Sequence, residues 1–128
     1  MKRLLLDTHV LLWWLTDDPG LGPHTRELVA DRRNEVYVSA ASTWEISIKR
    51  QKGLLEAPDN MDAFVEDEGF LKLDISLFHG DQAGSLPDIH RDPFDRMLIA
   101  QAQAEGLELV THDAMIRKYG IKVIDAVV

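Results

Sequence analysis

The chain has 128 residues, no cysteine and a formal net charge of −8. This length predicts one domain, residues 1–128, with a core of its own, and the lack of cysteine excludes a disulfide framework, a thiolate nucleophile and a cysteine zinc site. The acidic balance argues against a general nucleic-acid-binding surface, which is normally basic, although a site that binds a metal ion can be electropositive inside an acidic protein.

The N-terminal segment MKRLLLDTHVLLWWL begins like a secretion signal, but Asp7 and His9 interrupt its apolar run. No stretch of the chain approaches the ~18 uninterrupted apolar residues that a membrane-spanning helix requires. We therefore expect a cytoplasmic protein without a membrane partner.

Short apolar runs typical of strands alternate with helical patterns along the chain. We expect strands at residues 3–6, 36–39, 107–111 and 121–124. Helices are expected at about residues 8–15, 24–32, 41–51, 59–68, 75–84 and 93–105. This alternation predicts an α/β domain in which helices cover both faces of a parallel sheet.

The helix at 93–105 has the clearest boundaries. Asp92 is suited to the N-cap, Pro93 to the first helical position and Gly106 to the C-terminal cap. Asp92 is fully explained as this cap or as a residue that supports a site. Asp95 follows in the first turn, where the helix dipole also stabilises negative charge.

Four acidic residues are bordered by apolar sequence, where a solvated charge is unusual. Asp7 follows the first strand, Asp113 follows LELVT by two residues, and Glu45 and Asp95 lie within helices. Ligands of parallel α/β sheets bind outside the carboxyl ends of the strands. Convergence of the four acids there would need a divalent cation such as Mg²⁺ or Mn²⁺ to offset their repulsion.

Each acid also has a structural interpretation that remains open. Asp7 and Asp113 could cap a helix or begin a turn, and Glu45 could lie in water at a helix flank. The five histidines show no HExxH pair or comparable spacing. We expect them to be surface or supporting residues and not metal ligands.

The segments LLLDTHVLLWW, VSAASTWEISIK, RDPFDRMLIAQAQAEGLELVTHD and YGIKVID resemble the PIN-domain family, and within it the VapC-type toxins. The resemblance runs from Met1 to about Asp125. It implies a three-layer α/β/α fold with a central parallel sheet and an acidic site for Mg²⁺ or Mn²⁺.

The resemblance also implies roles for individual residues. The catalytic acids would be Asp7, Glu45, Asp95 and Asp113, of which Asp7, Asp95 and Asp113 would ligate the metal. Several further residues would support the site or contact substrate: Thr8, Ser39, Thr111, Asp92, Lys49 and Arg96. Lys49 and Arg96 could contact RNA phosphates or be ordinary surface charges.

The activity that the resemblance implies is metal-dependent endonucleolytic hydrolysis of RNA by a toxin of a VapBC-like pair. The implied partners are a second copy of the chain, in a homodimer, and a VapB-like antitoxin. The apolar segment from Val10 to Leu15 is a candidate groove for an antitoxin helix. Its tryptophans, Trp13 and Trp14, could instead belong to the core.

Three other functions fit less well. A haloacid-dehalogenase-like phosphohydrolase needs a second aspartate at position 9, where this chain has His9. An HD-type phosphohydrolase needs paired histidines on helices, whereas His112 beside Asp113 stands alone. A PIN scaffold that only binds RNA or protein is the non-enzymatic alternative, and loss of one or more of the four acids would mark it.

Overall fold

The computed structural model describes residues 1–128. Its strands are β1 (Arg3–Leu6), β2 (Glu35–Ser39), β3 (Leu71–Leu73), β4 (Glu108–Thr111) and β5 (Val123–Asp125). Its helices are α1 (Thr8–Thr16), α2 (Pro23–Ala30), α3 (Ala40–Gln51), α4 (Met61–Asp67), α5 (Leu77–Ser85), α6 (Pro93–Glu105) and α7 (Ala114–Arg117).

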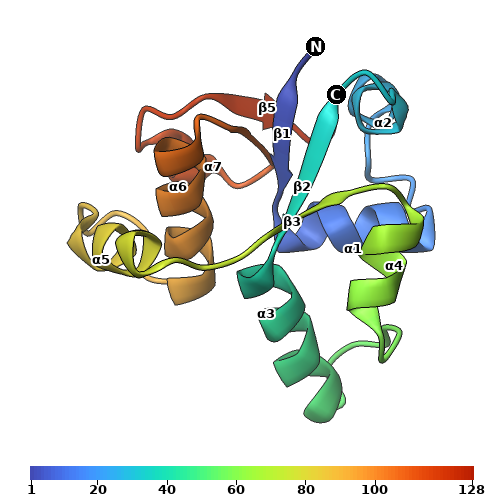
Figure 1. Ribbon diagram of the computed structural model, residues 1–128, viewed down its shortest axis with the longest axis horizontal. Helices are drawn as coiled ribbons and strands as arrows, with labels where there is room; N and C mark the ends of the chain where they lie inside the picture. The colour runs from blue at the N-terminus through green and yellow to red at the C-terminus, as the bar shows by residue number, and fades with distance from the viewer.

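The five strands form one parallel sheet in the order β3-β2-β1-β4-β5 (Figure 1). β1 is central, and Leu5 pairs with Tyr37 of β2 on one side and with Leu109 of β4 on the other. The predicted central parallel sheet is therefore confirmed. Because all strands run the same way, the ends of β1 and β4 lie side by side, which brings residues near positions 7 and 111 together.

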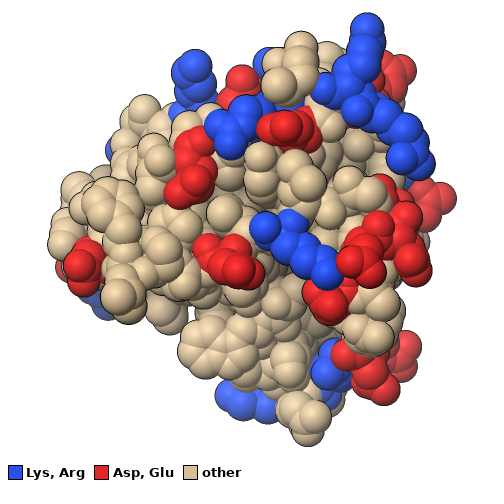
Figure 2. All heavy atoms as spheres, in the orientation of Figure 1, with Lys and Arg blue, Asp and Glu red and all other residues tan.

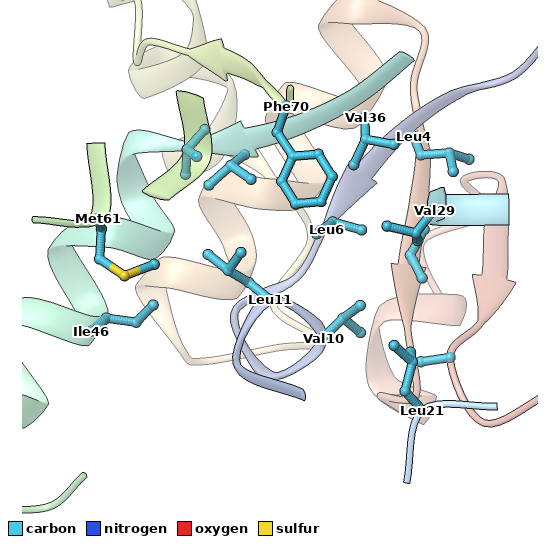
Figure 3. Close-up of a cluster of buried hydrophobic side chains, with 14 residues drawn as sticks. Leu4, Leu6, Val10, Leu11, Leu21, Val29, Val36, Ile46, Met61 and Phe70 are labelled. Carbon is cyan, nitrogen blue, oxygen red and sulfur yellow. The ribbon is translucent and has the colours of Figure 1, made fainter. Parts of the chain in front are cut away.

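Alternate residues of β1 point to opposite faces of the sheet, as the pleat of a strand requires. Leu4 and Leu6 are fully buried in a cluster with residues of α1, α2 and α4, among them Leu11, Val29 and Met61 (Figure 3). Side chains of this cluster cover one face of the sheet. Their burial on three separate helices anchors that layer to the sheet.

The other face of the sheet is covered mainly by α6. Leu5 and Leu109 of the sheet pack there against Leu98, Ile99 and Ala102 of the helix. Figure 1 shows α5 and α6 on one side of the sheet, and α1, α2 and α4 on the other. The predicted three-layer α/β/α fold is confirmed.

Some expected boundaries were wrong. Strand β3, Leu71–Leu73, was not predicted, and β5 begins at Val123, two residues later than expected. β3 has three residues with Lys72 at its centre, and it forms only by pairing with β2 at Val38. No helix is long and apolar enough to cross a membrane.

Candidate functional site

Three of the four acids line one cavity of about 280 Å³ at the carboxyl edge of the sheet. Asp7 comes from the end of β1, Asp95 from the first turn of α6 and Asp113 from just beyond β4. The remaining lining residues come from α1 and from the end of β4: His9, Val10, Trp13 and His112. Side chains far apart in the sequence thus converge, as the parallel sheet predicts.

Asp7 is the N-cap of α1 and is only 6% exposed. Its Oδ1 accepts a hydrogen bond of 2.8 Å from the backbone N–H of Val10, and its Oδ2 accepts one from the hydroxyl of Thr111. Burial raises the pKa of Asp7 even though both hydrogen bonds favour the ionised form. The residue is a helix cap and a cavity-lining acid at once.

Asp95 has a carboxyl group with a strongly raised pKa. Burial is the main cause, the charge of Asp92 adds to it, and together with smaller contributions from Asp7 and Glu45 they raise the pKa of Asp95 to about 7. Asp92 caps α6 by accepting from the backbone N–H groups of Phe94 and Asp95, at 2.8 and 3.1 Å. Like charges gathered in a partly buried site attract a cation that offsets their repulsion.

Asp113 caps the short helix α7 and accepts a 2.7 Å hydrogen bond from the backbone N–H of Met115. A histidine also contacts this acid, since Nε2 of His90 lies 2.8 Å from Asp113 Oδ2. Burial by itself would raise the pKa of Asp113, but the hydrogen bonds from His90 and Met115 outweigh it and leave the pKa below its usual value. Asp113 therefore stays ionised more readily than Asp95.

Glu45 lies on α3 and is 7% exposed, so the alternative in which it is solvated is wrong. Its Oε2 pairs with Nζ of Lys49, one turn along the helix, at 2.9 Å. This hydrogen bond is the largest contribution to the raised pKa of Lys49. Glu45 does not line the cavity of the three aspartates, although it is close enough for its charge to raise the pKa of Asp95.

The small hydroxyl residues tie the elements around the site together. Thr8 donates a 3.0 Å hydrogen bond to Ser42, which joins α1 to α3. Ser39 caps α3 and donates to Gln101 of α6 at 2.6 Å. Thr111 contacts Asp7 directly, whereas Thr8 and Ser39 position helices.

The guanidinium of Arg96 binds the protein backbone. Its guanidinium donates to four carbonyl oxygens at 2.8–3.1 Å, those of Ala83, Leu86, Pro87 and His90. These bonds use its planar fork of donors to fasten the segment between α5 and α6. We therefore assign Arg96 this structural role, and a contact between Arg96 and RNA stays a prediction.

His90 was not among the predicted site residues. Its Nε2 lies 3.1 Å from Asp95 Oδ2 as well as 2.8 Å from Asp113, so the imidazole stands between the two acids. The sequence does carry a signal for it, because His90 precedes the helix cap Asp92 by two residues. A side chain at that position can reach back over the first turn of the helix, where Asp95 lies.

The donor set fits a hard divalent cation. One ligand atom each from His90, Asp95 and Asp113 all lie within 4.8 Å of one another, and Asp7 lines the same cavity. Carboxylate oxygens are the ligands that Mg²⁺ and Mn²⁺ prefer. Burial, with a smaller contribution from neighbouring acids, raises the pKa of Asp7 and of Asp95, and a bound cation would favour the ionised form of both.

A second cavity, of about 300 Å³, lies between α3, α4 and β3. Its cationic residues are already paired, Arg50 with Asp59 at 3.5 Å and Lys72 with Asp62 at 2.8 Å. Because these charges already neutralise one another, the second cavity attracts a further ion only weakly. The acidic cavity is therefore the better candidate site.

Comparison with known proteins agrees with this geometry. Residues 4–122 match the family model of the PIN domain. The chain belongs to the PIN-domain family. The matched residues run from within β1 to just before β5 and include all four predicted acids.

Among curated proteins, this PIN domain is similar to Ribonuclease VapC16 of Mycobacterium tuberculosis, with 44% identity over 43 residues. That match spans 34% of this chain and 30% of the relative, so the chain covers less than a third of that protein's length. The likeness is local.

Two solved structures share the fold over nearly the whole chain. One is DNA-bound VapBC from Salmonella typhimurium, with a TM-score of 0.72, 22% identity and 98% of each chain covered. The other is VapBC2 from Rickettsia felis bound to a promoter DNA fragment, with a TM-score of 0.71, 17% identity, and 95% of this chain and 97% of that chain covered. At these identities the likeness establishes the fold.

Proposed function

We propose that this PIN domain is a Mg²⁺- or Mn²⁺-dependent endoribonuclease, the toxin of a VapBC-like toxin–antitoxin pair. The observation that carries the proposal is the convergence of Asp7, Asp95 and Asp113 in one cavity at the carboxyl edge of the sheet. Burial is the main cause that raises the pKa of Asp7 and Asp95, and the charges of neighbouring acids add to it. A fold that only bound RNA would have no need of such an arrangement.

The three aspartates would hold the cation, and their neighbours keep them in place. When bound, a divalent cation lowers the pKa of water and stabilises the charge that develops on a phosphate under attack. Thr111 and the backbone N–H of Val10 fix the two oxygens of Asp7. The N–H of Met115 fixes one oxygen of Asp113, so the carboxylates are already oriented before a substrate arrives.

Glu45 would complete the site directly or through water, as the sequence predicts. The ion pair with Lys49 restricts its carboxylate to the flank of α3 that faces Asp95. Lys49 remains 38% exposed. A contact between Lys49 and an RNA phosphate therefore stays a prediction.

The test is cleavage of total cellular RNA by the purified protein with Mg²⁺, with Mn²⁺ and with EDTA. Asp7→Asn and Asp95→Asn keep the side-chain volume and remove the charge, so both should abolish cleavage. Asp67→Asn on the exposed surface of α4 is the matched control and should keep it. Cleavage that persists in the site variants would show contamination or a misplaced site, and metal binding without cleavage would favour the RNA- or protein-binding scaffold.

The VapB-like partner would bind on the side of the sheet that carries α1. Trp13 and Trp14 are half-buried: each packs against the core cluster and leaves part of its ring exposed to solvent. Trp14 lines a groove of about 200 Å³ together with Val29, Val36 and Phe70. The apolar side of this groove, which includes Trp14, would receive one face of an amphipathic helix, and its polar side is formed by Asp31, Arg32, Asn34 and Glu68.

This proposal is tested by titrating the protein with a VapB-like antitoxin encoded beside it and following tryptophan fluorescence. Trp44 on α3 is 61% exposed and lies apart from the groove, so it serves as the internal control. A variant that keeps Trp13 and Trp14 but carries Trp44→Phe should retain the change in emission. A signal that disappears with Trp44 would place the antitoxin elsewhere.

We also propose that the chain forms a homodimer through α5 and the adjoining part of α3. Leu77 is 93% exposed, Phe78 59% and Trp44 61%, and the Trp44 ring packs edge-on against Phe94 at 5.2 Å. Figure 2 shows that the side of the molecule carrying α5 is mostly uncharged, whereas charged residues gather over α2 and α4. Exposed aromatic and aliphatic side chains of this kind are typical of a protein interface.

A further inference from the structure

His90 occupies the gap between two acids of the proposed metal site. Its Nε2 is 2.8 Å from Asp113 Oδ2 and 3.1 Å from Asp95 Oδ2, and its side chain is 14% exposed. Asp95 and Asp113 come from different elements, α6 and the start of α7. The imidazole is thus the side chain that links them.

The segment between α5 and α6 is fastened in a way that fixes this imidazole. The backbone N–H of His90 donates to the Tyr119 hydroxyl at 2.7 Å, and its carbonyl accepts from Arg96 at 3.1 Å. The Tyr119 hydroxyl donates in turn to the carbonyl of Pro87 at 2.8 Å. Both backbone groups of His90 are therefore held by side chains, one from α6 and one from the turn after α7, so the imidazole has little freedom to move away from the two acids.

The partner of the other ring nitrogen determines what the imidazole can do. Nδ1 accepts a 3.2 Å hydrogen bond from the backbone N–H of Asp92. With Nδ1 used as an acceptor, the ring proton lies on Nε2, which must donate. A histidine that ligates a metal normally donates through its second nitrogen, and here that nitrogen faces a donor instead.

We propose that His90 is a positioning residue: its Nε2–H donates to the carboxylate of Asp113 and holds it beside that of Asp95, whose Oδ2 lies 3.1 Å from the same nitrogen, while the imidazole stays outside the ligand set. The proposal rests on the proposed metal-dependent function. His90 acts through the two acids and touches neither metal nor substrate. Hydrogen bonds of this kind, made to metal ligands, change metal affinity by about 10–100-fold.

The experiment measures Mn²⁺ binding without RNA, by electron paramagnetic resonance, in the wild type and three variants. His90→Leu removes the donor and should weaken Mn²⁺ affinity by about 10–100-fold. His90→Gln places an amide N–H near the position of Nε2 and should recover the affinity to within a few-fold. His24→Leu, on the exposed surface of α2, is the matched control and should bind as the wild type does.

A spin-echo spectrum of the bound Mn²⁺ separates positioning from ligation. The proposal predicts no coupling to an imidazole nitrogen in the wild type. A nitrogen coupling that His90→Leu abolishes would make His90 a ligand, and tighter binding by His90→Leu would make it a competitor for the cation's place. Either result overturns the proposal, as does unchanged affinity in a folded His90→Leu protein.

RNA cleavage by the same preparations distinguishes this inference from the proposed function. If the wild type and His90→Leu bind Mn²⁺ and cleave RNA equally, the nuclease proposal stands and the role of His90 is wrong. If His90→Leu loses affinity as expected but the wild type cleaves no RNA, the role of His90 stands and the nuclease proposal fails. A wild type that binds no Mn²⁺ overturns both.

Discussion

Thr111 holds two acids of the site with one hydroxyl group. Its Oγ1 donates to Oδ2 of Asp7 and accepts the backbone N–H of Asp113 at 3.1 Å. Thr111 is fully buried at the end of β4, beside the end of β1. The hydroxyl is therefore the direct link between the acids that the two central strands supply.

The first prediction concerns this hydroxyl. Thr111→Val keeps the shape of the side chain but removes the donor to Asp7, so the carboxylate should lose its orientation and hold a cation less well. We expect Mn²⁺ affinity to fall by about 10–100-fold, measured by calorimetric titration. Thr111→Ser restores the donor and should bind nearly as the wild type does; equal affinities in the valine variant would contradict the assignment.

The second prediction concerns the stability of the metal-free protein. The pKa of Asp95 is about 7 in the folded protein against an ordinary 3.8, so folding favours its protonated form. The stability that this group contributes is present below the ordinary pKa and is lost as the pH rises through the folded one. Ionisation of Asp95 therefore lowers the free energy of unfolding at neutral and higher pH.

The measurement is urea unfolding in the presence of EDTA at several pH values between about 5 and about 8. Over this range the wild type should lose free energy of unfolding relative to Asp95→Asn, which cannot ionise. The Asp67→Asn control should follow the wild type. If the free energies of unfolding of wild type and Asp95→Asn change with pH in parallel, the pKa of Asp95 is not raised in the folded protein.

The third prediction separates a structural from a substrate-binding role for Arg96. Arg96→Met removes the donors to four carbonyl oxygens, which should reduce the free energy of unfolding by about 2–4 kcal/mol. Arg91→Met, at an exposed neighbouring position, should stay within about 0.5 kcal/mol of the wild type. Urea unfolding of both variants tests this, and an Arg96→Met protein as stable as the wild type would contradict the structural role of Arg96.

The fourth prediction concerns assembly. Leu77→Glu combined with Phe78→Glu places two charges on the apolar face of α5 and should convert a homodimer to a monomer. Leu54→Glu changes an equally apolar side chain, 69% exposed in the segment after α3, and should leave the dimer intact. Sedimentation equilibrium gives the mass of each; a dimer that survives the double substitution would place the interface on another surface.

The sequence predicted most of the fold because its strongest signals are local. The cap at Asp92 and the αL glycine at Gly106 bound α6 at the expected residues. The apolar run at residues 3–6 is the central strand, since full burial on both faces leaves no polar alternation. Asp7 and Asp113 proved to be helix caps as well as cavity-lining acids, so the two interpretations were not exclusive.

The features that the sequence did not predict depend on contacts between residues that are far apart in the chain. β3 has an exposed Leu71 and a central Lys72, so nothing in its composition marks a strand until β2 is beside it. His90 lies in a segment without periodicity. Its position depends on Tyr119 and Arg96, and a pattern search does not connect those residues with it.

The position of β4 beside β1 also affects the protein while it is being made. Asp7 and Glu45 leave the ribosome early, but Asp7 receives its hydrogen bond from Thr111, which lies 104 residues further along the chain. Asp95 and Asp113 are likewise late in synthesis. A nascent chain therefore cannot assemble the acidic cavity until β4 has joined the sheet, so the proposed nuclease would become active only when the chain is nearly complete.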